Sequence, residues 1–251
     1  MSAIADSLVR TERTGRLLVV RMCRESKRNA VNRQLAAAFN LLEDDDDLWA
    51  GVLTGTGSVF CAGSDLTAGG DYCTERGGEY GLIRRQRRKP LIAAVEGPAL
   101  GGGMELVLAC DLVVASRTAR FGLPEVSRGV VASSGALFMA PRGLPASLAR
   151  ELLLTGEPIG ADRGYAAGLV NVVTEPGGAV AAAVALGTRI CANAPVAVQA
   201  SLVAVNRWLA AAEEFGWQVT ADALAAIGAS RDYQEGVAAF LEKRPPNWTG
   251  R

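Results

Sequence analysis

LIAAVEGPALGGGMELVLACDLVVAS, residues 91–116, places a glycine-rich turn between apolar runs. The run at 91–97 follows Pro90 and has the length and composition of a buried strand. Residues 102–109 have a helical pattern, and 111–115 form a second apolar run typical of a strand. A strand, a helix and a strand in this order favour an α/β fold with a mostly parallel, buried sheet.

The same alternation continues on both sides of this stretch. Towards the N-terminus, apolar runs at 16–23 and 50–55 predict strands, and apolar residues at helical spacing predict a helix over 29–43. Beyond Ser147 a strand is expected only at 169–173. Helices are predicted at 147–155, 161–167, 178–193, 196–214, 216–229 and 232–241. We therefore expect an α/β core followed by a helical region packed against it.

Composition restricts the chemistry. The chain has 251 residues, 26 basic and 26 acidic side chains, and no histidine. Without histidine, Ser-His-Asp and Cys-His catalysis and histidine-ligated zinc are excluded, so carboxylates become the main candidates for proton transfer. The zero net charge argues against a nucleic-acid partner. Hydrophobic residues make up 49% of the chain, yet no uncharged apolar segment is long enough to predict a membrane span.

Cysteine usage and the N-terminus predict a cytoplasmic protein. The five cysteines are scattered without CxxC spacing, which is typical of small buried side chains in a reducing compartment. Residues 1–16 carry charges and lack the apolar stretch of a signal peptide.

Two charge runs have structural interpretations. Asp44 to Asp47 lies between a predicted helix and a predicted strand, which favours a solvated, capping turn over a calcium loop. Five basic residues between Arg84 and Lys89 are expected on a helix, with a solvated face as the first interpretation. Contact with an anionic ligand or a partner subunit is the alternative for this second run.

Nucleotide-binding and hydrolase motifs are incomplete. GTGSVF at 55–60 has Phe60 at the third glycine of a dinucleotide fingerprint, and no acidic residue ends a second strand at the required distance. Neither a P-loop nor a GxSxG nucleophile elbow is present.

The glycine-rich turn predicts a site for negative charge. Gly101, Gly102 and Gly103 precede or open the predicted helix, where amides have no intrahelical acceptor and the helix dipole is positive. Glu105 follows within the first turn. The alternative is that the glycines allow tight packing and that Glu105 only complements the dipole.

Two further segments complete a possible constellation. FCAGSDL at 60–66 follows the strand at 50–55, so the amide of Ser64 can point into a cleft. FGLPEV at 121–126 places Glu125 among apolar neighbours, where a carboxyl has a raised pKa; an exposed loop glutamate is the alternative. Two amides and two glutamates together suit an acyl carbonyl whose oxygen gains charge during reaction.

These residues resemble the crotonase, or enoyl-CoA hydratase/isomerase, superfamily. The resemblance covers nearly the whole chain. Its quoted segments are KRNAVN at 27–32, VLTGTGSVFCAGSDL at 52–66, KPLIAAVEGPALGGGMELVLACDLVVAS at 89–116, ARFGLPEVSRG at 119–129, ELLLTGEPIGADRGYAAGLVNVV at 151–173 and EGVAAFLEKRPPNW at 235–248. The resemblance implies the α/β crotonase spiral of ββα units over 1–195. It also implies a C-terminal helical oligomerisation region over 196–251.

The resemblance also implies roles for individual residues. The amides of Ser64 and Gly102 would form an oxyanion hole for a thioester carbonyl, and Glu105 and Glu125 would hold the water and move the protons of a hydration. The residues implied to line the substrate path are Lys27, Arg28, Ala30, Ala62, Ser64, Asp65, Leu66, Gly101, Gly102 and Pro124. Lys27 and Arg28 could face coenzyme A phosphates or only solvent. No metal or separate cofactor is implied, because coenzyme A belongs to the acyl-CoA substrate, and a homotrimer or hexamer is expected.

Departures from the family pattern leave the reaction open. Ser64 stands where alanine is common, and 129–142 differ from the usual glycine-rich stretch beside the acyl pocket. Because both glutamates are present, enoyl-CoA hydratase is the leading hypothesis. An enoyl-CoA isomerase or another acyl-CoA reaction, and a non-catalytic acyl-CoA-binding subunit, are the alternatives. The glycine-rich segment 67–83 is expected to form a mobile wall of the acyl pocket.

Overall fold

A six-stranded sheet forms the centre of the computed structural model, which describes residues 8–31, 33–64 and 72–250. The strand order is β1-β2-β3-β6-β8-β11. In that order the strands are Val9–Thr14, Leu17–Met22, Ala50–Gly55, Leu91–Val95, Leu112–Ser116 and Val172–Thr174. All neighbours pair in parallel except the antiparallel β1–β2 hairpin.

Two smaller sheets lie beside the main sheet. One has the order β10-β9-β7, with strands Ile159–Gly160, Arg120–Gly122 and Pro98–Leu100. The other is the β4–β5 hairpin of Cys73–Thr74 and Gly78–Glu79. Strands β7 and β9 pair in parallel with Leu100 opposite Gly122, so both end at the same edge.

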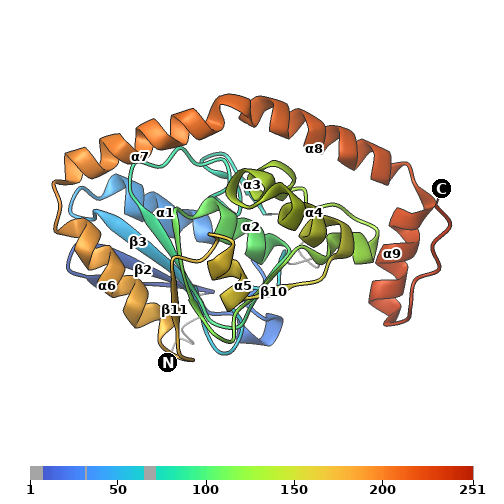
Figure 1. Ribbon diagram of the computed structural model, residues 1–251, viewed down its shortest axis with the longest axis horizontal. Helices are drawn as coiled ribbons and strands as arrows, with labels where there is room; N and C mark the ends of the chain where they lie inside the picture. The colour runs from blue at the N-terminus through green and yellow to red at the C-terminus, as the bar shows by residue number, and fades with distance from the viewer. Residues whose placement is uncertain (1–7, 32, 65–71, 251) are drawn as a thin grey trace, which may run out of the picture.

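Helices follow the strands and then dominate the C-terminal third. The α-helices α1 to α9 are Leu35–Asp44, Gly102–Ala109, Ala136–Gly143, Ala146–Thr155, Ala161–Ala166, Ala179–Cys191, Pro195–Leu209, Glu213–Gly228 and Arg231–Glu242. The short 3-10 turns η1, η3 and η4 are Glu25–Lys27, Pro124–Arg128 and Ala210–Ala212. Helix α6 lies along the sheet, α7 and α8 form an arc over the core, and α9 turns back at the far side (Figure 1).

Both faces of the main sheet are covered, which explains why its central strands have continuous apolar sequences. Val52 and Ile92 face Ala183 of α6 in one buried cluster. Leu53 and Phe39 belong to the larger cluster on the opposite face, which also contains residues of α2 and α3. The predicted α/β class with a mostly parallel sheet is confirmed.

Element boundaries differ from the predictions where local side-chain chemistry competes with the apolar pattern. Helix α1 begins at Leu35 rather than near Asn29, because Asn29 has a φ of 53° and its buried side chain holds a loop. Strand β11 begins at Val172 rather than at Leu169, which is buried in the preceding loop. Strands β1, β7, β9 and β10 and helix α3 have no counterpart among the predicted elements.

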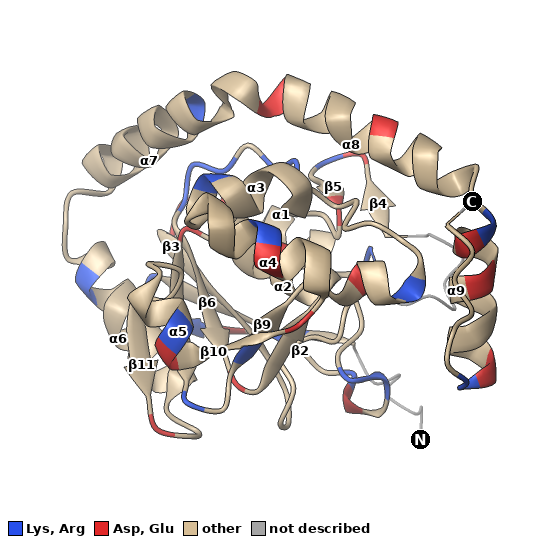
Figure 2. Ribbon diagram, turned by 45° about the vertical axis from the view of Figure 1, so that its right-hand side comes forward, with Lys and Arg blue, Asp and Glu red and all other residues tan. Residues whose placement is uncertain are grey.

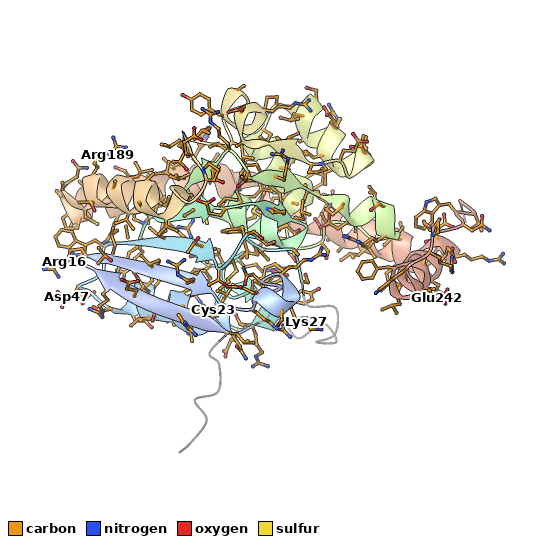
Figure 3. The ribbon with its side chains drawn as sticks, turned by 90° about the horizontal axis from the view of Figure 1, so that it is seen from below. Arg16, Cys23, Lys27, Asp47, Arg189 and Glu242 are labelled. Atoms are coloured by element: carbon orange, nitrogen blue, oxygen red, sulfur yellow. The ribbon has the colours of Figure 1, made fainter. Side chains whose placement is uncertain are left out.

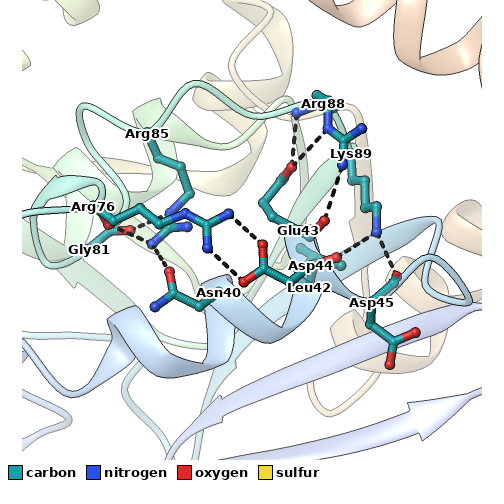
Figure 4. A network of polar contacts seen from close by, with 10 residues as sticks. All are labelled: Asn40, Leu42, Glu43, Asp44, Asp45, Arg76, Gly81, Arg85, Arg88 and Lys89. Atoms are coloured by element: carbon teal, nitrogen blue, oxygen red, sulfur yellow. Dashed lines mark hydrogen bonds and ion pairs between the residues drawn. The ribbon is translucent and has the colours of Figure 1, made fainter.

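The basic run before Pro90 is not a helix, and two of its members are buried. Arg87 is 8% exposed, and both of its terminal nitrogens donate to the Asp111 carboxylate, at 2.6 and 2.8 Å. The Lys89 Nζ donates to the carbonyls of Leu42 and Asp45 at 2.8 and 2.7 Å (Figure 4). The predicted solvated helix face is therefore wrong, because these cations satisfy carbonyls at the end of α1 and an acid before β8.

The acidic run Asp44 to Asp47 forms the turn after α1, as predicted. The Asp45 carboxylate accepts from the amide of Asp47, and Asp44 receives both terminal nitrogens of Arg76 (Figure 4). Cys61 is buried, but Cys73 is exposed, so the prediction of buried thiols fails at that position.

Within the described ranges, no single helix is long and apolar enough to span a bilayer. Among the described helices, only the bent pair Ala179–Cys191 and Pro195–Gly228, taken together, has the length and composition of a span. In the same ranges, no group of three or more cysteine, aspartate or glutamate side chains could hold a metal ion.

Candidate active site

The site lies where β7 and β9 end side by side. β7 continues through Gly101 into α2, and β9 continues through Leu123 into η3. Gly101 has a φ of 56°, and a Cβ there would lie 3.2 Å from the Glu125 Oε1. Only glycine fits both the backbone conformation and the space, so the turn brings the start of α2 against the second glutamate.

The two predicted oxyanion-hole residues are neighbours. A Cβ on Gly102 would lie 3.2 Å from the backbone nitrogen of Ser64, and a Cβ on Gly63 would lie 3.6 Å from the nitrogen of Gly102. Gly102 is the first residue of α2, so its amide has no acceptor within the helix and lies at the positive end of the dipole. The two amides are therefore close enough to donate hydrogen bonds to one oxygen atom.

Glu105 is a buried carboxyl held from α3. It is 2% exposed, and its Oε1 accepts from the amide of Ala136 at 3.3 Å. Burial raises the pKa of Glu105 to about 8, and the nearby Glu125 carboxyl adds to the rise. Hydrogen bonds from Ala136 and from the amide and hydroxyl of Ser134 oppose this rise in pKa. A buried carboxyl with a raised pKa keeps its proton near neutral pH, which argues against the alternative that Glu105 only complements the helix dipole as an anion.

Glu125 lies in η3, directly after Pro124 at the start of that turn. Its Oε2 is buried and has no hydrogen-bond partner among the residues that the structure describes. Burial raises the pKa of Glu125 to about 7, against the effects of its own backbone amide and of Arg128. A buried oxygen without a partner costs free energy unless a ligand or water binds it, so Glu125 is not an ordinary loop glutamate.

The loop that carries the predicted coenzyme A residues is fixed against Ser64. The amide of Ala62 donates to the Arg28 carbonyl at 3.0 Å, and the amide of Val31 donates to Gly63 at 3.0 Å. Asn29, a residue that the sequence patterns did not single out, donates to the carbonyls of Thr56 and Val59 at 2.9 and 2.7 Å. This buried amide clamps the loop and sets its path beside the oxyanion hole.

Lys27 and Ala30, two of the residues predicted to line the substrate path, belong to this same loop. Ala30 lines a hollow with Met22, Asn29 and Leu35, and Lys27 lies on the outer surface beyond the end of β2, near Cys23 (Figure 3). Asp65 and Leu66 lie outside the described residues.

A tyrosine that sequence reasoning did not single out is also part of the site. Tyr80 is 1% exposed, and its hydroxyl lies 2.6 Å from the Ser64 Oγ and 3.2 Å from the Ser134 Oγ. Leu82 and Ile83 are buried as well, so the second half of the predicted mobile wall is packed into the core. The one available signal was an aromatic side chain between glycines in GGEYG, 77–81, which indicates close backbone packing.

The last helix packs on η3. A Cβ on Gly236 of α9 would overlap the carbonyl oxygen of Arg128, and the Arg128 guanidinium lies 5.1 Å from the ring centre of Phe240. The turn that carries Glu125 is therefore supported by the C-terminal end of the chain.

Two neighbouring backbone amides beside two carboxyls with raised pKa values define a site suited to acid-base chemistry on a polarised carbonyl compound. The family model for enoyl-CoA hydratase/isomerase matches residues 12–251, and this chain belongs to that family.

Curated relatives match along nearly the whole chain. The chain is 38% identical to a mevalonyl-coenzyme A hydratase of Aspergillus fumigatus, covering 94% of this chain and 92% of the relative. It is 37% identical to an enoyl-CoA hydratase of Mycobacterium tuberculosis, covering 98% and 97%. Among solved structures, a carnitinyl-CoA hydratase from Mycobacterium avium superposes with a TM-score of 0.93 at 41% identity, covering 98% of this chain and 100% of that one.

Proposed function

We propose that this protein is an enoyl-CoA hydratase that adds water across the α,β double bond of an acyl-CoA thioester. The observation that carries the proposal is the pair Glu105 and Glu125, whose carboxyls have raised pKa values of about 8 and 7 beside two adjacent amides. Such a pair can hold one proton between its members near neutral pH, as addition of water requires. The hydratase names of the relatives agree with this chemistry.

In the proposed mechanism the two amides stabilise charge and the two glutamates transfer protons. The thioester oxygen would lie between the amides of Ser64 and Gly102, which stabilise the negative charge that develops there. Glu105 would accept a proton from the bound water while its oxygen bonds to the β carbon. The reacting form is the one in which the shared proton is on Glu125, which would deliver it to the α carbon. The proton that Glu105 has accepted then passes through the next bound water to Glu125, which restores the pair. Lys27 and Arg28 are the proposed contacts to coenzyme A phosphates, and no separate cofactor takes part.

The deciding experiment is a hydration assay with crotonyl-CoA and longer enoyl-CoA thioesters, followed by the loss of enoyl-thioester absorbance. Because a solved relative is named for carnitinyl-CoA, that thioester belongs in the panel, in the dehydration direction. A 3-hydroxyacyl product seen by NMR in deuterated water supports hydration. A shifted double bond would instead identify an isomerase, and tight binding without product would identify a binding subunit.

We also propose a homotrimer or hexamer in the cytoplasm, with α7 to α9 as the oligomerisation region. Large apolar side chains are exposed along these helices, with Trp208 at 81%, Phe215 at 70% and Leu241 at 71%. Figure 2 shows few charged residues along the α7–α8 arc. Apolar surface of this kind is typical of subunit contacts. Light scattering after gel filtration should give three or six times the 26.1 kDa chain mass, and a monomer would contradict the proposal.

A further inference from the structure

Three hydroxyls form a chain from the oxyanion hole to the first glutamate. The Ser64 Oγ lies 2.6 Å from the Tyr80 hydroxyl, which lies 3.2 Å from the Ser134 Oγ. Ser134 belongs to the segment that holds the Glu105 carboxyl: it lowers the pKa of Glu105, and the amide of Ala136, two residues further on, donates to the Glu105 Oε1 at 3.3 Å. Tyr80 and Ser134 are 1% and 2% exposed, so bulk water does not compete for these contacts. The chain runs from the predicted oxyanion donor to the predicted base through Tyr80.

The backbone holds the phenol in place at a conformational cost. Tyr80 has a φ of 55°, a left-handed conformation that is unfavourable for any residue that carries a Cβ. Its amide donates to the Tyr72 carbonyl at 2.6 Å, and the two rings lie 5.4 Å apart. A strained residue persists where the surrounding structure fixes it, and such positions gather at functional sites.

The phenol also touches the second oxyanion residue. A Cβ on Gly102 would lie 2.5 Å from the Tyr80 oxygen and 3.0 Å from the ring carbon that carries it. Tyr80 therefore contacts Ser64 through its hydroxyl and packs directly over the first residue of α2. No other side chain that the structure describes has recorded contacts to Ser64, Gly102 and Ser134 together.

We propose that Tyr80 is a positioning residue that couples the oxyanion hole to Glu105 through Ser134. This inference rests on the roles proposed above for Ser64, Gly102 and Glu105. When Glu105 is ionised, it fixes the direction of every hydroxyl: Ser134 donates to Glu105, Tyr80 donates to Ser134, and Ser64 donates to Tyr80. When Glu105 accepts a proton, this acceptor is lost and the chain can reverse, which frees the Ser64 hydroxyl proton as charge develops on the thioester oxygen.

The coupling acts through hydrogen bonds, not through proton transfer along the chain. A Ser134 hydroxyl that itself accepts from Tyr80 is a stronger donor to the carboxylate, because hydrogen bonds in a chain polarise one another. Within the described part of the chain, three titratable groups interact electrostatically with Glu105. They are the carboxyl of Glu125 from η3 and the phenols of Tyr72 and Tyr80 from the β4–β5 region. Loss of the Tyr80 hydroxyl removes the donor to Ser134 and so weakens the stabilisation of the ionised Glu105, whose pKa should therefore rise.

The experiment measures the Glu105 pKa by carbon NMR of glutamate labelled at the carboxyl carbon, with Glu105→Gln to assign the signal. Tyr80→Phe should raise this pKa by about 0.5 units, and Ser134→Ala by about 1 unit, because the direct donor is lost. In the Ser134→Ala background, Tyr80→Phe should add nothing, since Tyr80 acts through Ser134. Tyr72→Phe removes the same atom from the neighbouring ring and is the matched control, expected to shift the pKa by less than about 0.2 units.

Activity gives a second readout. Tyr80→Phe should lower kcat for crotonyl-CoA about 10-fold with KM within about 2-fold, since the positioned groups act on the transition state. A Glu105 pKa equal to that of the Tyr72→Phe control, or equal effects of Tyr80→Phe with and without Ser134, would overturn the inference.

The two proposals fail separately. Absence of crotonyl-CoA turnover in the unaltered protein would count against the hydratase, while the NMR titration still tests the chain. If Tyr80→Phe does not fold, Ser64→Ala tests the other end of the chain. In the proposed chain its half-buried hydroxyl donates to Tyr80 across the 2.6 Å contact. Its removal should therefore raise the Glu105 pKa by less than Tyr80→Phe, and no rise at all would contradict the coupling.

Discussion

The two glutamates of the site come from differently built segments. Glu105 lies in the first turn of an eight-residue α-helix, is 2% exposed, and is held by donors that precede or begin α3. Glu125 lies in a five-residue 3-10 turn in which no residue is fully buried. One carboxyl is therefore positioned by the core and the other by a turn supported from α9. We call the Glu105 part, held by the core, the rigid side of the site, and the Glu125 part, held by a turn that α9 supports, the braced side. Similar rises in pKa occur on both sides.

The largest expected effect is loss of either carboxyl. Glu105→Gln and Glu125→Gln should each lower kcat for crotonyl-CoA by about 100-fold or more, because each removes a proton donor or acceptor. Glu157→Gln, on the exposed loop before β10, is the matched control and should keep the unaltered rate. The shortened Glu105→Asp should lose more activity than Glu125→Asp, since the helix cannot follow the shorter side chain. Equal losses of activity in the two aspartate variants would contradict the inference that Glu105 is held more rigidly than Glu125.

The next effect concerns the oxyanion hole on the rigid side. Gly102→Ala should lower kcat/KM by about 100-fold, the scale of a lost oxyanion donor, because its Cβ would crowd the Tyr80 oxygen at 2.5 Å. Gly143→Ala, at the last position of α3, meets nothing within 4 Å and controls for the glycine-to-alanine change itself. Steady-state kinetics of both variants check this. A fully active Gly102→Ala would contradict the tight packing of Tyr80 over the start of α2 that this prediction rests on.

A smaller effect is expected on the braced side. Gly236→Ala places a methyl group against the Arg128 carbonyl, so α9 must move away from η3. We expect kcat to fall about 3-fold to 10-fold and the melting temperature to drop by about 2–4 °C per kcal/mol lost. Gly228→Ala in α8 meets nothing within 4 Å and should be neutral or slightly stabilising. If the two variants behave alike, α9 does not support Glu125.

The smallest effect is on stability, and its sign depends on pH. The pKa of Glu105 rises from 4.5 to about 8 on folding. Between these values the unfolded chain ionises while the folded chain keeps its proton, so the group destabilises the fold increasingly as pH rises. Glu105→Gln should therefore gain roughly 1–3 kcal/mol of stability at pH 8 relative to pH 4. Urea unfolding at both pH values measures this.

The same comparison with Glu125→Gln sharpens the contrast between the two segments. Because the pKa of Glu125 rises only to about 7, the gain between pH 4 and pH 8 should be smaller than for Glu105→Gln. If neither Glu105→Gln nor Glu125→Gln is more stable at pH 8 relative to pH 4, the burial of both carboxyls is contradicted.

The rigid side of the site could be predicted from the sequence better than the braced side. The run at 102–109 matches α2, since glycines, an apolar face and flanking strands agree there. Strands β7 and β9 have three residues each and pair across a long separation, which leaves no local pattern to recognise. Helix α3 contains Pro141 and follows Gly135, residues that usually mark an end rather than a helix.

Side chains that act across the fold were also beyond sequence reasoning. Glu105 and Glu125 could be chosen as candidates from their neighbours in the chain. Tyr80 and Ser134 could not, because their contacts join a hairpin, a loop and a helix start that only the folded chain brings together. The buried Arg87 and Lys89 were misjudged for the same reason, since their carbonyl and carboxylate partners lie more than twenty residues away.

The packing of α9 on η3 has a consequence for biosynthesis. Residues 231–242 leave the ribosome after the strands of the main sheet and α2, which precede them in the chain. A nascent chain can therefore form the sheet and the Gly102 turn while Glu125 still lacks its supporting helix. The support of the second glutamate is thus completed only after α9 has left the ribosome, later than the rest of the site.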